Sequence, residues 1–156
     1  MRQKILIMGL PGAGKTTLAR VLAPRLEAVW FNADDVRKHV NRCLGFSLAD
    51  RIEHARRMGW LCDQVISAGH AAVADFVCPT HETRRAFGDA FVIWVDRIAS
   101  SPFEDTNYLF EPPSEYHVRV AASGAPEFWV DKIVRRLSDT APKLSVIVTN
   151  GHFETA

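Results

Sequence analysis

The chain has 156 residues, 47% of them hydrophobic, so we expect a single domain over residues 1–156 with an ample apolar core. Its 19 lysines and arginines nearly balance 18 aspartates and glutamates, and the formal net charge is +1. This balance excludes the strong positive field of a protein that binds duplex nucleic acid or a membrane surface. We therefore expect neither partner, and any anion site must be local.

Cysteine usage and the N-terminus bear on location. Cys43, Cys62 and Cys78 are odd in number and form no C-x-x-C pair, which argues against a disulfide framework or a zinc site. Such usage is typical of a reducing cytoplasm. The N-terminal apolar run is broken by glycine and proline, is too short to span a bilayer and lacks a cleavage site, so we interpret it as a strand.

Apolar runs and helical repeats alternate along the chain. From the N-terminus, the pattern predicts a strand over 4–8, a helix over 15–26, a strand over 28–31, a short helix within 32–43, a helix from Ser47 to Gly69, a strand over 71–77 and a short helix over 81–88. It then predicts a strand over 91–95, a loop or lid over 97–115, a strand over 116–120, a helix over 126–138 and a further strand over 144–149.

This alternation predicts an α/β fold of three layers, the P-loop NTPase and kinase fold. Its sheet would be mostly parallel and five-stranded, with helices on both faces and residues 144–149 as an extra C-terminal strand. For the helix over 126–138 we expect an inward face made of Phe128, Ile133, Val134 and Leu137. Ligands of such sheets bind at the carboxyl ends of the strands, so functional residues should follow residues 8, 31, 76 and 95.

The strongest motif follows the first strand. The run from Gly9 to Thr17 is a complete G-x-x-x-x-G-K-T between a strand and a helix. We expect its backbone amides to cradle phosphates, Lys15 to reach the β- and γ-phosphate oxygens, and Thr16 to ligate Mg²⁺. The predicted nucleotide-binding residues are Gly9, Gly12, Ala13, Gly14, Lys15, Thr16 and Thr17. The alternative is a glycine-rich turn that only begins a helix.

A P-loop does not show whether the phosphate passes to water, to an acceptor or nowhere. One domain of this size leaves no room for switch regions with partner surfaces or for motor modules, and it matches small kinases of metabolites. Asp75 ends the small apolar run of the third predicted strand, a Walker-B pattern that places a carboxylate near the metal. The alternative for Asp75 is a residue that caps the next turn.

Two later segments resemble adenylyl-sulfate kinases. The run from Asn32 to Arg37 is similar to the Asp-Gly-Asp-Asn-Val-Arg motif of that family, and LGFSLADRIEHARR is similar to its Gly-Phe-Ser and Asp-Arg-x-Glu-Asn run. The similarity covers residues 3–96. The resemblance implies transfer of the γ-phosphate of ATP, with Mg²⁺, to the 3′-hydroxyl of adenosine 5′-phosphosulfate, by a cytoplasmic enzyme of sulfate assimilation. It also implies a homodimer.

The resemblance assigns roles to individual residues. Asp34 matches the aspartate near the acceptor hydroxyl and Mg²⁺, and Phe46 matches the aromatic residue that stacks on the acceptor adenine. The groups that match those holding the phosphosulfate and nucleotide are Arg37, Asn41 and Arg51. Arginine forks suit sulfate and phosphate oxygens, and a phenylalanine face suits a base. Alternatives are a solvated helix face for the arginines and core packing for Phe46.

With the P-loop included, the predicted catalytic residues are Lys15, Asp34 and Asp75, and the predicted metal ligands are Thr16, Asp34 and Asp75. The chain departs from the family at Asn32, where the family has an aspartate, and at His54, where it has an asparagine. The family's Lys-Gly-Leu-Tyr-Lys-Lys lid is replaced by residues 96–117. Two further hypotheses therefore stay open: a kinase of another small sulfated, phosphorylated or nucleotide-linked acceptor, and a non-catalytic nucleotide-binding regulator.

Overall fold

A five-stranded sheet forms the centre of the molecule. The structure is a computed structural model and describes residues 2–121 and 123–140. The strands are β1 (Lys4–Met8), β2 (Val29–Asn32), β3 (Ala72–Asp75), β4 (Phe91–Val95) and β5 (Val118–Val120). They pair in the order β2-β3-β1-β4-β5, and all four pairings are parallel. The five predicted strands are confirmed, and the sixth, over 144–149, lies outside the described residues.

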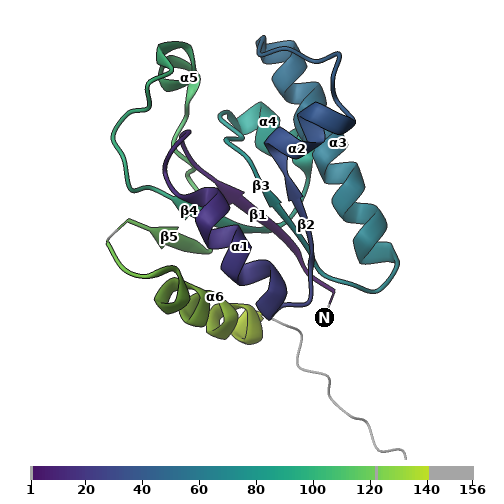
Figure 1. Ribbon diagram of the computed structural model, residues 1–156, viewed down its shortest axis with the longest axis vertical. Coiled ribbons are helices and arrows are strands. Elements are labelled where there is room, and N and C mark those ends of the chain that lie inside the picture. Colours follow the sequence, from purple (N-terminus) through teal and green to yellow (C-terminus); the bar gives the residue numbers. More distant parts are fainter. Residues whose placement is uncertain (1, 122, 141–156) are drawn as a thin grey trace, which may run out of the picture.

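Helices cover both faces of this sheet. They are α1 (Lys15–Arg25), α2 (Ala33–His39), α3 (Leu48–Ser67), α4 (His81–Phe87), α5 (Glu104–Leu109) and α6 (Pro126–Thr140). In Figure 1, α1 and α6 lie on one side of the sheet and α3 and α4 on the other. The predicted three-layer α/β fold is therefore confirmed. Across residues 2–121 and 123–140, no helix is long and apolar enough to cross a membrane.

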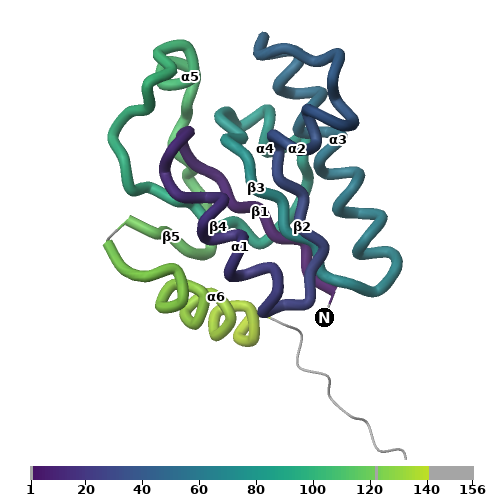
Figure 2. The backbone as a smooth tube through the Cα atoms, in the orientation of Figure 1, coloured from purple at the N-terminus to yellow at the C-terminus, as the bar shows by residue number. Residues whose placement is uncertain are grey.

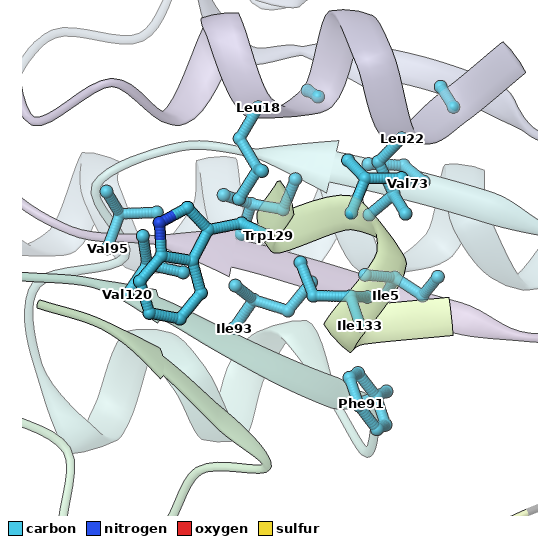
Figure 3. Packing of buried hydrophobic residues seen from close by; sticks show 14 of the residues in the cluster. Ile5, Leu18, Leu22, Val73, Phe91, Ile93, Val95, Val120, Trp129 and Ile133 are labelled. Atoms are coloured by element: carbon cyan, nitrogen blue, oxygen red, sulfur yellow. The ribbon is translucent and has the colours of Figure 1, made fainter. Parts of the chain in front are cut away.

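Strand β1 shows why its sequence is a continuous apolar run. Ile5 and Ile7 belong to the hydrophobic cluster under α1 and α6, whereas Leu6 and Met8 belong to the cluster under α3 and α4. Side chains alternate between the two faces of a strand, so a strand covered on both faces is apolar at every position. Figure 3 shows the first cluster, in which Ile5 lies near side chains contributed by α1, α6 and the neighbouring strands.

The inward face predicted for α6 was wrong at one position. Phe128 is 52% exposed, and its ring lies against Lys132, whose Nζ is 4.8 Å from the ring centroid. The buried residues of this helix are Trp129, Val130, Ile133 and Leu137. Two adjacent aromatic residues cannot share one face of a helix, and the sequence does not show which of them the sheet covers. In Figure 3 the Trp129 ring lies near Val95 and Val120.

The segment over 97–115 was predicted to be a loop or lid, and part of it is the short helix α5. Ser101 and Asn107 hold its start, because Asn107 Oδ1 accepts hydrogen bonds from the amide and hydroxyl of Ser101, both at 2.8 Å. The start of this helix is held by polar contacts, and its sequence lacks apolar residues at helical spacing. The hydrophobic pattern therefore did not predict it. In Figure 2, α5 lies beyond the carboxyl ends of the strands, at the same end of the sheet as α2.

A stability prediction follows from the contact between α3 and α4. A Cβ at Gly59 would lie 2.2 Å from the carbonyl oxygen of Phe87. Replacing a helical glycine with alanine normally stabilises by about 1 kcal/mol. For Gly59→Ala we expect the opposite sign, a loss of about 1–3 kcal/mol in the free energy of unfolding, because backbone must move. Chemical denaturation measures it, with the exposed Gln64→Ala on the same helix as control. An unfolding midpoint equal to that of the unsubstituted protein would contradict this packing.

Candidate active site

The glycine-rich loop joins the end of β1 to the start of α1. Gly14 is the N-cap residue of α1 and adopts φ 103°, a left-handed conformation that favours glycine. Among the residues that the structure describes, no side chain caps this helix, and its first turn holds no acidic residue. The free N–H groups and the positive end of the helix dipole are therefore available to an external anion. This geometry is compatible both with a phosphate-binding loop and with a turn that only begins a helix. It does provide the N–H groups and the positive helix end that phosphate binding requires.

Lys15 is the first residue of α1, directly after this loop, and is buried, with 8% of its surface exposed. Its Nζ donates a hydrogen bond to the carbonyl oxygen of Leu10 at 2.9 Å. Burial lowers the pKa of Lys15 to about 8, while the charges of Asp75 and Asp34 raise it. A phosphate in the loop would favour the ammonium form further, because an opposite charge close by stabilises the charged state.

The ends of β2 and β3 place three polar side chains on the α1 face of the sheet. Asn32 and Asp75 stand opposite each other in register. Trp30 shares their face because it precedes Asn32 by two residues in a strand. Asp75 Oδ1 accepts from Asn32 Nδ2 at 3.1 Å and from the Thr16 hydroxyl at 3.3 Å. Asp75 Oδ2 accepts from Trp30 Nε1 at 2.6 Å. The carboxylate is thus fixed beside the first turn of α1.

The environment of Asp75 is unusual for a carboxylate. Asp75 is 2% exposed, and its burial raises its pKa. Hydrogen bonds from Trp30 and Asn32, the charge of Lys15 and the Thr16 hydroxyl lower the pKa and oppose this effect. Asn32 is itself fixed, because its Oδ1 caps α2 by accepting from the Asp35 amide at 3.2 Å. Within the described residues, the Asp75 carboxylate bonds to side chains of β2 and α1, which does not support the interpretation of Asp75 as a cap for the following turn.

A cavity of about 460 Å³ opens at this end of the sheet. Its wall comes from the glycine-rich loop, the ends of β2 and β3, and residues near the start of α5, and its charged residues are Lys15, Arg51, Asp34, Asp75 and Asp105. Of the predicted nucleotide-binding residues, Gly12, Lys15 and Thr16 line it, whereas Gly9, Ala13, Gly14 and Thr17 do not. Gly14 and Thr17 instead line a separate small cavity of about 10 Å³.

Asp34 lines the cavity from the first turn of α2 and is exposed. Its charge raises the pKa of Lys15 and also the pKa of Arg37, in both cases against the larger effect of burial. Asp34 therefore lies within electrostatic reach of the phosphate-binding loop on one side and of the arginines near Phe46 on the other.

Phe46 lies at the rim of the cavity and is 63% exposed. The interpretation of Phe46 as a core residue was therefore wrong. The Arg37 guanidinium lies 4.3 Å from its ring centroid, and the Arg51 guanidinium lies 5.4 Å from it. Arg37 also donates to the carbonyl oxygen of Gly45 at 2.9 Å, and it lines a smaller adjoining cavity of about 80 Å³.

Arg51 extends from α3 into the main cavity and is buried, so it is not part of a solvated helix face. Its Nε donates to the carbonyl oxygen of Phe46 at 2.9 Å, and its Nη2 donates to the Thr106 hydroxyl at 3.0 Å. Asp105 Oδ2 lies 3.5 Å from the same Nη2. Burial lowers the pKa of Arg51, and the Asp105 charge raises it.

Asn41, predicted to bind substrate, is fully buried and lines neither of these cavities. Its Nδ2 lies 2.9 Å from Nδ1 of His54, and its Oδ1 accepts from Arg57 Nη1 at 3.1 Å. Burial, with smaller contributions from Arg37 and Arg57, lowers the pKa of His54 to about 4. The structure thus connects Asn41 with His54, which lines the smaller cavity, while Asn41 itself lies in the wall of neither cavity.

Sequence reasoning missed three residues of the site. Trp30 could have been found from the alternation of β2, which places it on the same face as Asn32. Asp105 and Thr106 had no signal, because they come from the segment without periodicity and reach Arg51 across 54 and 55 positions of the chain.

Comparisons with known proteins agree with this geometry. The family model for adenylylsulphate kinase matches residues 2–93. An adenylyl-sulfate kinase of Synechococcus sp. (strain JA-3-3Ab) is 33% identical over 101 residues, which cover 62% of this chain and 57% of that protein. The chain spans about half the length of the curated relatives it matches.

Solved structures show the same fold. An APS kinase of Mycobacterium tuberculosis, solved in complex with AMPPNP and APS, matches with a TM-score of 0.77 and 20% identity, covering 87% of this chain and 97% of that one. A sugar kinase of Janibacter sp. HTCC2649 matches with a TM-score of 0.72 and 18% identity, covering 91% of this chain and 97% of that one. Likenesses at this level of identity concern the fold alone.

Proposed function

The chain belongs to the adenylylsulphate kinase family, and on this basis we propose that it transfers the γ-phosphate of ATP to the 3′-hydroxyl of adenosine 5′-phosphosulfate, a step of sulfate assimilation. The observation that carries the proposal is the position of Asp34. Its carboxylate lines one cavity together with Lys15 of the phosphate-binding loop and with Arg51 and Phe46. Groups for a phosphate donor, a hydroxyl and an anionic aromatic acceptor therefore meet in one cavity.

Each side chain then has a defined task. The loop amides and Lys15 bind and orient the β- and γ-phosphates, and the Lys15 charge stabilises the negative charge that develops during transfer. The Asp34 carboxylate orients the acceptor hydroxyl and accepts its proton. The Arg51 guanidinium pairs with the phosphosulfate, and the exposed face of Phe46 stacks on the base.

We propose Mg²⁺ as cofactor, because the residues present fit this ion. The Thr16 hydroxyl and the Asp75 carboxylate lie 3.3 Å apart beside the loop, and Mg²⁺ is usually held by one or two carboxylates, hydroxyls and the phosphates of the substrate. Thr16 and Asp75 would hold it, and Asp34 lines the same cavity. The chemistry that the bound ion supplies is neutralisation of charge on the phosphate oxygens. Asp75 would thereby provide the charge that Asn32 lacks.

A coupled assay of ADP release tests the proposed function. With ATP and Mg²⁺ present, we expect ADP release only after adenosine 5′-phosphosulfate is added. The comparisons do not favour the two alternatives, and the same assay separates them. Release with a different sulfated or phosphorylated acceptor, but not with the phosphosulfate, would indicate another substrate. Nucleotide binding without ADP release in the presence of any acceptor would indicate a regulatory protein.

The acceptor arginines give a prediction about kinetics. Arg51 uses Nε and Nη2 toward different partners, a geometry that a lysine ammonium cannot reproduce. We expect Arg51→Lys and Arg37→Lys to raise the KM for the acceptor by about tenfold, the loss of one charged hydrogen bond, with a much smaller change for ATP. Steady-state kinetics with each substrate varied measures this, and the exposed Arg56→Lys on α3 is the control. Equal effects on both substrates would place these arginines outside the acceptor site.

We also propose a cytoplasmic location and a homodimeric assembly. Cys43, Cys62 and Cys78 are all free, which supports a reducing compartment such as the cytoplasm. A homodimer follows from the family resemblance alone, and sedimentation of the full chain would measure it.

A further inference from the structure

The α5 helix contacts the main cavity through one cation. The Arg51 guanidinium donates a hydrogen bond to the Thr106 hydroxyl at 3.0 Å and lies 3.5 Å from the Asp105 carboxylate, and both partners belong to the first turn of α5. The two partners differ in surroundings: Thr106 is buried, whereas the Asp105 side chain is 71% exposed. The hydroxyl is therefore a fixed neutral partner, and the carboxylate is a partner that can turn toward solvent at little cost.

The charges of the cavity make this contact important for an anionic ligand. Among the described residues, Lys15 and Arg51 are its two cations, and three carboxylates line it with them. Lys15 serves the phosphate donor, so Arg51 is the cation of this cavity that remains for an anionic acceptor, and Arg37 lies beside it in the smaller adjoining cavity. Asp105 already provides Arg51 with a negative partner, and an incoming anion would meet that carboxylate at the same guanidinium.

We propose that Asp105 is a specificity-determining residue that competes with the anionic group of the acceptor for Arg51. The inference rests on the proposed function, since it takes adenosine 5′-phosphosulfate as the acceptor. In the free protein Asp105 balances the buried charge of Arg51. When the phosphosulfate binds, its oxygens replace the Asp105 carboxylate, while the Phe46 carbonyl and the Thr106 hydroxyl keep the guanidinium in place. The cavity then favours acceptors whose anionic group pairs with Arg51 better than a carboxylate at 3.5 Å.

The direction in which Asp105→Asn changes the affinity for the acceptor shows whether Asp105 competes for Arg51 or holds Arg51 in place. If Asp105 competes, Asp105→Asn keeps the shape of the side chain, removes the rival charge and tightens acceptor binding. If Asp105 instead holds Arg51 in its productive position, the same substitution weakens binding. An ion pair whose carboxylate is exposed, as that of Asp105 is, corresponds to about a two- to fivefold change in affinity.

The experiment is calorimetric titration of the full chain with adenosine 5′-phosphosulfate, in the presence of Mg²⁺ and ADP so that no turnover occurs. We expect Asp105→Asn to lower the dissociation constant about two- to fivefold. Glu104→Gln is the matched control, because Glu104 is an exposed acid on the same helix and the substitution removes the same charge. A second ligand, adenosine, has no anionic group, and its affinity should be equal in both variants and in the unsubstituted protein.

Each outcome has one meaning. Tighter binding of the phosphosulfate by Asp105→Asn than by Glu104→Gln supports competition. Unchanged or weaker binding by Asp105→Asn, with normal binding by the unsubstituted protein, overturns the inference and leaves the proposed function intact. An equal gain in both variants shows only a general effect of charge and also overturns it. Failure of all three proteins to bind the phosphosulfate overturns the proposed acceptor, and the inference with it.

Discussion

Lys15→Ala is expected to lower kcat by at least about 10²–10³-fold, because the substitution removes a preorganised positive charge from the transferring phosphate. The side chain is buried and lies across the loop, where Nζ is 2.9 Å from the Leu10 carbonyl oxygen. A phosphate in the loop offers this ammonium a stronger, charged partner than the carbonyl. Catalysis of phosphoryl transfer consists almost entirely of positioning and charge stabilisation, so losing the Lys15 ammonium should directly lower the rate of transfer.

Steady-state kinetics at saturating ATP measures the effect. Lys38→Ala is the matched control, because Lys38 is an exposed lysine on α2 and lines neither described cavity. A thermal melt of both variants separates loss of catalysis from loss of folding. A kcat for Lys15→Ala close to that of the unsubstituted protein would contradict the assignment of the glycine-rich loop to phosphate transfer.

The second large effect concerns the division of tasks between two acids. Asp34 lines the cavity from α2 and is exposed, whereas Asp75 is buried against the Thr16 hydroxyl. We expect Asp34→Asn chiefly to lower kcat, by about 10²–10⁴-fold, the range for loss of a general base. For Asp75→Asn we expect at least about a tenfold rise in the Mg²⁺ concentration that gives half-maximal activity.

Titration of activity with Mg²⁺ at fixed ATP measures both variants, and Asp35→Asn, an exposed acid of the same turn as Asp34, is the control. Trp30 supplies a readout that is independent of activity, because its Nε1 donates to Asp75 Oδ2 and its fluorescence should respond when Mg²⁺ and ADP bind. The double variant should lose less than the product of the single losses, since the two acids share one site.

An unchanged Mg²⁺ titration for Asp75→Asn would make Asp75 a structural residue. The negative charge of the aspartate that the family carries at the position of Asn32 would then have no substitute. A nucleotide-binding protein without catalytic activity would become the better interpretation. The two acids therefore test the proposal at the point where this sequence departs from its family.

Much of the geometry around the glycine-rich loop could be predicted because its signals are local. The strand from Lys4 to Met8 and the loop after it lie within about a dozen residues, and the side-chain alternation of β3 fixes the face on which Asp75 lies. Family similarity extends this to residue 93. The strand order could not be read from periodicity, and it is what brings Asn32 opposite Asp75.

The proposed acceptor half of the site was less predictable because it depends on contacts between distant segments. From the sequence alone, the Phe46 ring could lie in the hydrophobic core or at the rim of the cavity. The fold shows that it is exposed. Asn41 matched a family position but lies in a buried network with His54. The α5 residues that reach Arg51 come after the region matched by the family model, from a segment whose helix is held by polar contacts.

The most direct test of the account is to follow the γ-phosphate itself. Incubation with γ-labelled ATP, Mg²⁺ and adenosine 5′-phosphosulfate should give ADP and a labelled product in equal amounts, with the label on the 3′-oxygen as determined by ³¹P spectroscopy. The 3′-deoxy form of the acceptor should bind and yield no labelled product. Label recovered only as free phosphate, or transferred equally to the 3′-deoxy form, would contradict the claim that this cavity directs the γ-phosphate to the 3′-hydroxyl.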